Sequence, residues 1–197
     1  MSILLLSGGY DSTAIAWRER PNLALTFDYG QTPAAGEIRA SRAICSELGI
    51  AHEIIAADLR PLGSGDLAGR SALDISPSPE WWPYRNQMLL TFAAMRALQL
   101  GERRLIIGTV STDAFHGDGQ QHFFATFNDL LLCQEGDLRV ETPAIELTTQ
   151  ALIRDTGTPR RLLAWCHSCH VAEWACGQCR GCLKALAVRQ DLGYGNS

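Results

Sequence analysis

Short apolar runs alternate with stretches of helical periodicity along most of the chain. The apolar runs have the length of buried strands and lie at residues 3–6, 23–28, 52–56, 105–109 and 139–142. Apolar positions recur with helical spacing at residues 13–18, 37–48, 87–100, 121–133 and 148–155. This alternation predicts an α/β fold with a five-stranded, Rossmann-like parallel sheet, right-handed crossovers and helices on both faces.

Two stretches depart from the simple pattern. Residues 87–100 are apolar on nearly every side of the expected helix, which predicts that this helix is buried. Residues 59–83 follow neither period and are rich in glycine and proline. An irregular segment of this length in a compact domain is usually functional, often as a lid, or else disordered. Trp81 and Trp82 are expected to anchor its end.

The segment Ser7-Gly8-Gly9-Tyr10-Asp11-Ser12 joins the first strand to the first helix. Glycines let the backbone approach an anion closely, and the amide groups at a helix start point toward it. The two serines add hydroxyl donors, and Asp11 can cap the helix or help to hold Mg²⁺. No Gly-Lys-Ser/Thr follows, so the segment is not a Walker A loop. It resembles the Ser-Gly-Gly-x-Asp-Ser loop of the PP-loop ATP pyrophosphatases, which cleave ATP to AMP and pyrophosphate.

Three further segments follow expected strands. They are residues 28–31, residues 108–113 and residues 141–143. The carboxyl ends of parallel strands meet at one edge of a sheet, where ligands bind near the reversal of strand order. We therefore expect these segments to gather around the glycine-rich loop.

Composition narrows the class of protein. The chain has 197 residues, 46% of them apolar and 19% charged, as in a globular protein of one domain. The net charge of −4 and the lack of a basic tail argue against nucleic acid as a partner. We find neither a run long enough to span a membrane nor a secretion signal, so the expected location is the cytoplasm.

Five of the seven cysteines crowd between Cys166 and Cys182. Cys176, Cys179 and Cys182 follow a Cys-x-x-Cys-x-x-Cys pattern, and one upstream ligand would complete the tetrahedron that structural Zn²⁺ prefers. Of the upstream residues we select Cys169 and leave Cys166 free or as a substitute. An iron–sulfur cluster is the alternative to zinc at these cysteines.

The remaining candidate ligands and cysteines have simpler interpretations. His167 and His170 are expected near the metal or on the surface, and the isolated Cys45 and Cys133 are expected to be small buried hydrophobes.

Together the motifs resemble the QueC, or 7-cyano-7-deazaguanine synthase, family over nearly the whole chain. The resemblance rests on the glycine-rich loop, residues 26–31, Arg85-Asn86, Gly108, Thr112-Asp113, residues 141–143 and the cysteine run. It implies a PP-loop domain over residues 1–158 and a zinc-binding helical segment over residues 159–197. It also implies an ATP-dependent ligase that uses Mg²⁺, activates a deazapurine carboxylate for attack by ammonia, and forms a homodimer.

The same resemblance assigns functions to individual residues. Residues Ser7 to Ser12 would bind the phosphates, with Tyr10 counted among the nucleotide-binding positions. Phe27, Tyr29 and Gly108 would lie close to the nucleotide. Asp11, Ser12, Arg85 and Asp113 would act on the reacting groups. For Arg85 a surface ion pair is an equal alternative.

One segment departs from the family pattern. Members carry Tyr-Pro-Asp-Cys-Arg shortly after the Thr-Asp pair, whereas residues 114–123 read Ala-Phe-His-Gly-Asp-Gly-Gln-Gln-His-Phe. Asp113, His116 and Asp118 are candidates for purine recognition, although His116 and His122 as plain loop residues are the simpler interpretation.

This departure leaves the acyl acceptor open. A QueC-like paralogue of antiviral defence that acylates a protein amine, a tRNA thiolase with a metal cluster, and a nucleotide-binding module without turnover are alternatives.

Overall fold

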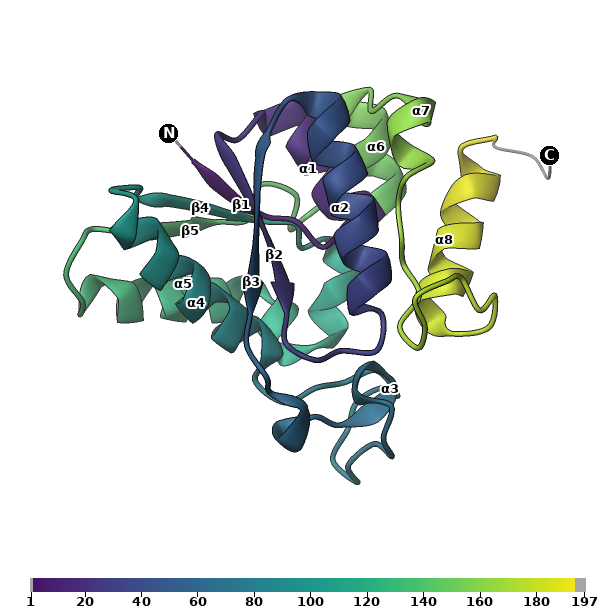
Figure 1. The fold of residues 1–197 in the computed structure, drawn as a ribbon, viewed down its shortest axis with the longest axis horizontal. Helices are drawn as coiled ribbons and strands as arrows, with labels where there is room; N and C mark the ends of the chain where they lie inside the picture. The colour runs from purple at the N-terminus through teal and green to yellow at the C-terminus, as the bar shows by residue number, and fades with distance from the viewer. Residues whose placement is uncertain (1, 194–197) are drawn as a thin grey trace.

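The computed structural model describes residues 2–193 and shows a five-stranded sheet with all strands parallel (Figure 1). The order across the sheet is β3-β2-β1-β4-β5. The strands are β1 (Ile3–Leu5), β2 (Leu23–Asp28), β3 (Ala51–Ala56), β4 (Arg104–Ile107) and β5 (Arg139–Glu141). The predicted α/β fold and its five parallel strands are confirmed.

The strand order reverses at β1, which pairs with β2 on one side and β4 on the other. Leu4 of β1 lies opposite Ala24 of β2 and opposite Ile106 of β4. The chain therefore winds outward in both directions from β1, and the loops after β1 and β4 diverge at this point. A crevice forms there in doubly wound sheets and usually binds the ligand.

Helices cover both faces of the sheet, as predicted. One face carries α1 (Tyr10–Glu19), α2 (Ala34–Leu48), α6 (Thr149–Thr156), α7 (Arg160–Leu163) and α8 (Arg180–Asp191). The other face carries α4 (Arg85–Gln99) and α5 (Gln121–Leu132). Successive residues of β1 serve the two cores in turn, with Leu4 facing the first group of helices and Ile3 and Leu5 facing the second.

The prediction of an entirely buried helix at residues 87–100 is wrong. Helix α4 packs one side on the sheet through Leu90, Ala93 and Ala97, whereas Met95 is 58% exposed and Leu98 is 44% exposed. Only one layer of structure lies against α4, so its outer side faces solvent whatever its composition.

The irregular segment 59–83 is ordered and contains two short helices, η1 (Arg60–Leu62) and α3 (Gly65–Ala68). Figure 1 shows it at the lower end of the molecule, beyond the carboxyl ends of β2 and β3. Trp82 is 3% exposed and packs edge-to-face on Tyr29, with ring centroids 5.0 Å apart. The expected anchor is therefore present at Trp82.

The C-terminal segment shares a core with the sheet domain. Leu162 and Leu163 of α7 and Val188 of α8 belong to the same buried cluster as Leu4 and Ile15. The zinc-binding segment expected at residues 159–197 extends beyond the described range, because its last four residues lie outside it. None of the helices within residues 2–193 is long and apolar enough to cross a membrane.

The two isolated cysteines differ. Cys45 is buried in α2, as expected, but Cys133 is exposed. Cys133 directly follows α5, two positions after the buried Leu131 and therefore on the opposite side of the helix, so the prediction that it is buried is wrong.

Candidate functional site

The loop between β1 and α1 has a backbone that requires glycine. Gly8 has a φ of +76°, and a Cβ there would lie 2.8 Å from the Ala40 Cβ atom and 3.0 Å from the Glu37 carbonyl oxygen. A larger residue would meet both a strained conformation and a steric clash. The Gly8 carbonyl oxygen accepts a hydrogen bond from the His167 amide, which ties the loop to the C-terminal segment.

Two serine hydroxyls lie at the amino end of α1. The Ser7 and Ser12 Oγ atoms are 3.3 Å apart, and the Ser12 hydroxyl also donates to the Gly9 carbonyl oxygen at 3.2 Å. The Gly9 amide donates to Ser7 Oγ at 3.4 Å. Hydroxyl and amide donors at a helix amino terminus form a favourable environment for phosphate.

Asp11 presents an oxygen without a protein partner. Its Oδ2 atom accepts from Lys184 Nζ at 3.0 Å, whereas Oδ1 is buried and finds no hydrogen-bond partner among residues 2–193. Burial raises the pKa of Asp11, and the Lys184 charge opposes this shift. We call the Ser7–Ser12 loop the phosphate-type loop. A buried carboxylate oxygen beside it fits Mg²⁺, which prefers oxygen ligands.

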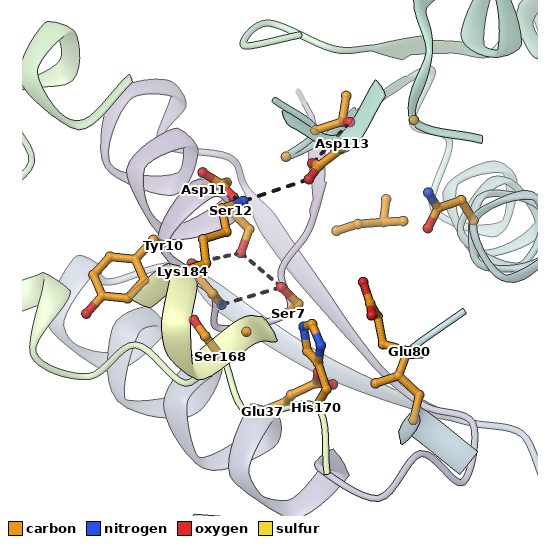
Figure 2. A pocket seen from close by; sticks show the side chains of 18 of the residues that line it. Ser7, Tyr10, Asp11, Ser12, Glu37, Glu80, Asp113, Ser168, His170 and Lys184 are labelled. Carbon is orange, nitrogen blue, oxygen red and sulfur yellow. Dashed lines mark hydrogen bonds and ion pairs between the residues drawn. The ribbon is translucent and has the colours of Figure 1, made fainter. Parts of the chain in front are cut away.

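Lys184 was not selected from the sequence as a site residue, but it lies in the cavity wall. It is the single lysine of the sequence and comes from α8, 173 positions away from Asp11. Its Nζ atom also lies 3.8 Å from Asp113 Oδ1 (Figure 2). Burial opposes its charge, but Asp11 and Asp113 raise the pKa of Lys184, so the amine is cationic. The sequence did hold one indication of its importance, because the single lysine of the chain closely follows the run of cysteines.

Gly108 brings the end of β4 against the loop. A Cβ at this position would lie 2.9 Å from both the amide nitrogen and the Cα atom of Ser12. Asp113 follows in a 3-10 turn and accepts a hydrogen bond from the Val110 amide at 3.1 Å. The predicted residues Gly108 and Asp113 therefore both adjoin the phosphate-type loop.

These elements surround one cavity of about 570 Å³, within the usual size of a small-molecule site. Phe27, Tyr29 and Arg85 line it together with the loop. The Arg85 guanidinium lies beside the Tyr29 phenol and donates to Asn86 Oδ1 at 3.3 Å. It therefore faces the cavity rather than a surface ion partner. Burial raises the pKa of Tyr29, so this phenol is neutral.

Tyr10 lies differently from the other residues of the loop. Its ring packs in the core, and its hydroxyl accepts from Arg189 Nε at 2.7 Å. Figure 2 shows this side chain directed away from Ser7 and Ser12. The side chain ties α1 to α8, so a contact with nucleotide would be left to its backbone.

Glu37 of α2 also lines the cavity. Its Oε2 atom accepts from Gln31 Nε2 at 2.8 Å. Burial raises the pKa of Glu37 to about 7, against the opposing effects of Gln31 and Arg85. Sequence reasoning placed Glu37 only at the start of a helix.

A second polar cluster was missed because it joins the irregular segment to α8. Glu80 accepts a hydrogen bond from Arg180 Nη1 at 2.9 Å and lies 3.7 Å from His116 Nε2. Burial disfavours the charge of Glu80, yet His116 and Arg180 beside it lower its pKa to about 2. His116 lines the cavity from the loop before α5, whereas His122 lies within α5 rather than in a loop.

The four cysteines selected from the sequence lie together. The sulfur atoms of Cys169, Cys176, Cys179 and Cys182 all lie within 4.8 Å of one another. The pairs Cys176–Cys182 and Cys169–Cys179 are each 3.9 Å apart, close to the ~3.8 Å edge of a tetrahedron with 2.3 Å metal–sulfur bonds. The fifth thiol, Cys166, lies apart and donates to Thr13 Oγ1 at 3.4 Å. Burial raises its pKa to about 12.

Backbone amides support the cluster as they do in metal sites. The Gln178 and Cys179 amides donate to Cys176 Sγ, and the Cys182 amide donates to Cys179 Sγ, each at 3.4 Å. The two donors lower the pKa of Cys176 to about 6, which favours the thiolate that binds metal. The set of residues fits one tetrahedral metal ion.

Comparison with known proteins identifies the family. The profile of the family described as queuosine biosynthesis protein QueC matches residues 1–190. The chain belongs to the QueC family. A curated relative from Acidobacterium capsulatum, named 7-cyano-7-deazaguanine synthase, is 32% identical over 96% of this chain and 92% of its own length. A relative of the same name from Paramagnetospirillum magneticum is 33% identical over 98% of this chain and 95% of its own.

The fold also occurs in a more distant solved structure. The U34-tRNA thiolase NcsA from Methanococcus maripaludis, solved with its [4Fe-4S] cluster, superimposes with a TM-score of 0.54. It is 16% identical, and the alignment covers 98% of this QueC-family chain but only 65% of the thiolase. At this identity the likeness concerns the fold alone, which is the predicted Rossmann-like type.

Proposed function

We propose that this QueC-family protein activates a 7-carboxy-7-deazaguanine-type carboxylate with Mg·ATP and converts it with ammonia to the nitrile. The observation that carries the proposal is the cavity in which the Ser7–Ser12 loop, Lys184 and Asp113 meet at the reversal of strand order. Members of the same family that align over most of this chain are named for formation of that nitrile.

The bond changes follow from the proposed substrates. A carboxylate oxygen attacks the α-phosphorus of ATP, and pyrophosphate leaves to give an acyl-adenylate. Ammonia attacks the acyl carbon, AMP leaves, and loss of a proton gives the amide. The amide oxygen then attacks the α-phosphorus of a second ATP, and pyrophosphate leaves. Departure of AMP and of the two amide protons leaves the nitrile. Each step develops negative charge on phosphate, so positioned donors and cations are what catalysis needs.

Residues of the loop supply those donors. The Ser7 and Ser12 hydroxyls and the amides at the start of α1 would hold the leaving pyrophosphate. Lys184 would move from Asp11 to a phosphate oxygen when ATP enters, because phosphate carries more charge than the carboxylate. Asp11 Oδ2 would then be released, and together with the unpartnered Oδ1 it could help to bind Mg²⁺, which supplies further positive charge to the phosphates.

The metal of the cysteine cluster is proposed to be structural Zn²⁺. Four sulfurs within 4.8 Å of one another suit a single ion, whereas the thiolates of a four-iron cluster each bind a different iron and lie further apart. A single bound ion would hold the start of α8, and through it Lys184, against the cavity.

The altered segment 114–123 favours a second candidate, in which the activated acyl group goes to a protein amine. It lacks the Cys and Arg of the family pattern, and its His116 lies in the cavity wall. Both candidates share formation of AMP and pyrophosphate, and they differ only in the nucleophile.

Mass spectrometry of products from protein, Mg·ATP, 7-carboxy-7-deazaguanine and ammonium separates these cases. Nitrile with AMP is the expected result. AMP and pyrophosphate accompanied only by amide or adenylate would favour another acceptor, and absence of AMP would contradict both candidates. Ser12→Ala should abolish most turnover, whereas Ser46→Ala on the exposed side of α2 provides a matched control.

A further inference from the structure

Glu80 is a buried carboxylate that the proposed phosphate chemistry does not use. It is 8% exposed, and it belongs to the irregular segment between β3 and α4. One oxygen, Oε1, is held by Arg180 at 2.9 Å. The other, Oε2, is buried and has no hydrogen-bond partner within the described part of the chain.

An ionised carboxylate can only accept hydrogen bonds, and a buried charge with an unused oxygen is unfavourable. Glu80 lines the same cavity as Ser7 and Ser12. Figure 2 shows it across the pocket from Tyr10 and Asp11. A ligand that reaches both sides would therefore meet phosphate donors at one end and a carboxylate acceptor at the other.

Resting on the proposed function, we infer that Glu80 recognises the 2-amino-pyrimidinone edge of the deazapurine by accepting hydrogen bonds from its N1–H and 2-amino groups. These two donors are adjacent and lie on the six-membered ring, away from the carboxylate on the five-membered ring. The carboxylate must reach the α-phosphate near the loop, so the six-membered ring would extend toward Glu80. Adenine presents a lone pair at N1 and does not match this acceptor.

The neighbouring His116 completes a guanine-type pattern. Its Nδ1 atom is also buried and lacks a partner among residues 2–193, and its Nε2 lies 3.7 Å from Glu80. An imidazole N–H beside the carboxylate suits the keto oxygen that adjoins N1–H in the base. Arg180 stacks within 5.4 Å of the Phe115 ring, which restrains the guanidinium that orients Glu80.

The wild-type enzyme tests the inference without a mutation. We would measure binding of 7-carboxy-7-deazaguanine and of its analogue without the 2-amino group by calorimetry, and kcat/KM for both with Mg·ATP. We expect a preference of at least about 100-fold for the 2-amino compound, because a site built for a donor rejects the analogue that lacks it. Equal binding and turnover of the two compounds would overturn the inference.

Glu80→Gln separates recognition from a structural tie. Glutamine can still accept from Arg180, but it replaces the free acceptor with a donor. We expect the preference to collapse toward about 1 while the KM for ATP changes less than about threefold. Glu80→Asp should retain part of the preference, and the exposed Glu135→Gln should leave all values unchanged. A Glu80→Gln enzyme that keeps the preference for the 2-amino compound would overturn this inference but leave the proposed function standing. A wild type that neither binds nor turns over the deazapurine would overturn the proposed function and this inference with it.

Discussion

The phosphate-type loop and the C-terminal segment form two walls of one cavity by different physical means. Residues Ser7–Ser12 connect a buried strand to a buried helix. Both flanking elements pack in the sheet core only a few residues away, so the core fixes the position of the loop. Residues 164–179 contain neither helix nor strand and place their side chains through four cysteines and a few polar contacts. The first wall depends on hydrophobic burial, and the second depends on a metal site.

Because the two walls are held in place differently, loss of the metal is expected to affect only one of them. Arg39 of α2 donates to Glu173 at 2.7 Å, and its guanidinium lies 3.8 Å from the centre of the Trp174 ring. Half-exposed contacts of this kind contribute little stability in water. Loss of the metal should therefore displace the second wall while the sheet and the loop remain folded.

The largest effect is expected from Cys179→Ser, which removes a metal-binding thiolate but leaves a hydroxyl that can still cap α8. Structural Zn²⁺ contributes roughly 10–16 kcal/mol of apparent binding free energy, more than weak surface contacts can replace. We expect metal content to fall to near zero and AMP formation to fall more than about 100-fold. Circular dichroism of the sheet domain should be largely retained.

The exposed Cys133→Ser is the matched control for that experiment, because Cys133 lies outside the cluster. Full metal content in Cys179→Ser would contradict the four-cysteine site. Complete unfolding on metal removal would contradict the separation between the two walls.

A smaller effect is expected from Lys184→Met, which leaves the metal site intact. Loss of one positioned charge at a developing anion typically lowers the rate about 100- to 1000-fold, and we expect that loss in kcat/KM for ATP. Lys184→Arg should recover part of the rate because it restores the charge. Unchanged kinetics of pyrophosphate release in Lys184→Met would show that the amine is only a structural partner of Asp11.

Gly108→Ala tests the contact between β4 and the loop. The added Cβ would lie 2.9 Å from the Ser12 backbone and must displace it. Overpacking of this kind costs about 1–3 kcal/mol of unfolding free energy, and the KM for ATP should rise about tenfold. Gly117→Ala is the control, since a Cβ there meets no atom within 4 Å. Equal urea midpoints for the two variants would contradict the close approach.

The smallest effect concerns Glu37 and depends on pH. Its pKa is raised from 4.5 to about 7 by burial, so the folded state binds more protons than the unfolded state between these values. Stability from this group is present below pH 4.5 and is lost as the pH rises through 7. At pH 8 the Glu37→Gln variant should therefore unfold at a higher urea concentration than the wild type. Its free energy of unfolding should be larger by at most about 3 kcal/mol. The difference should vanish near pH 4.5, and a constant difference across pH would contradict the shift.

Local patterns predicted the sheet, the loop after β1 and the four cysteines that lie together. In each case the decisive geometry spans only a few residues, as with Gly8 and Cys176-x-x-Cys179. Lys184 and Glu80 could not be placed in this way, because α8 and the irregular segment reach the cavity only through tertiary packing. The exposed side of α4 was mispredicted for the same reason, since composition does not reveal how many layers cover a helix.

The pairing of Asp11 with Lys184 also bears on how the protein is made. The two partners lie 173 positions apart, so the ribosome has completed most of the chain before they can meet. The nascent sheet can fold while this wall is still missing, and a product that stops before α8 would keep the loop but lack its cation.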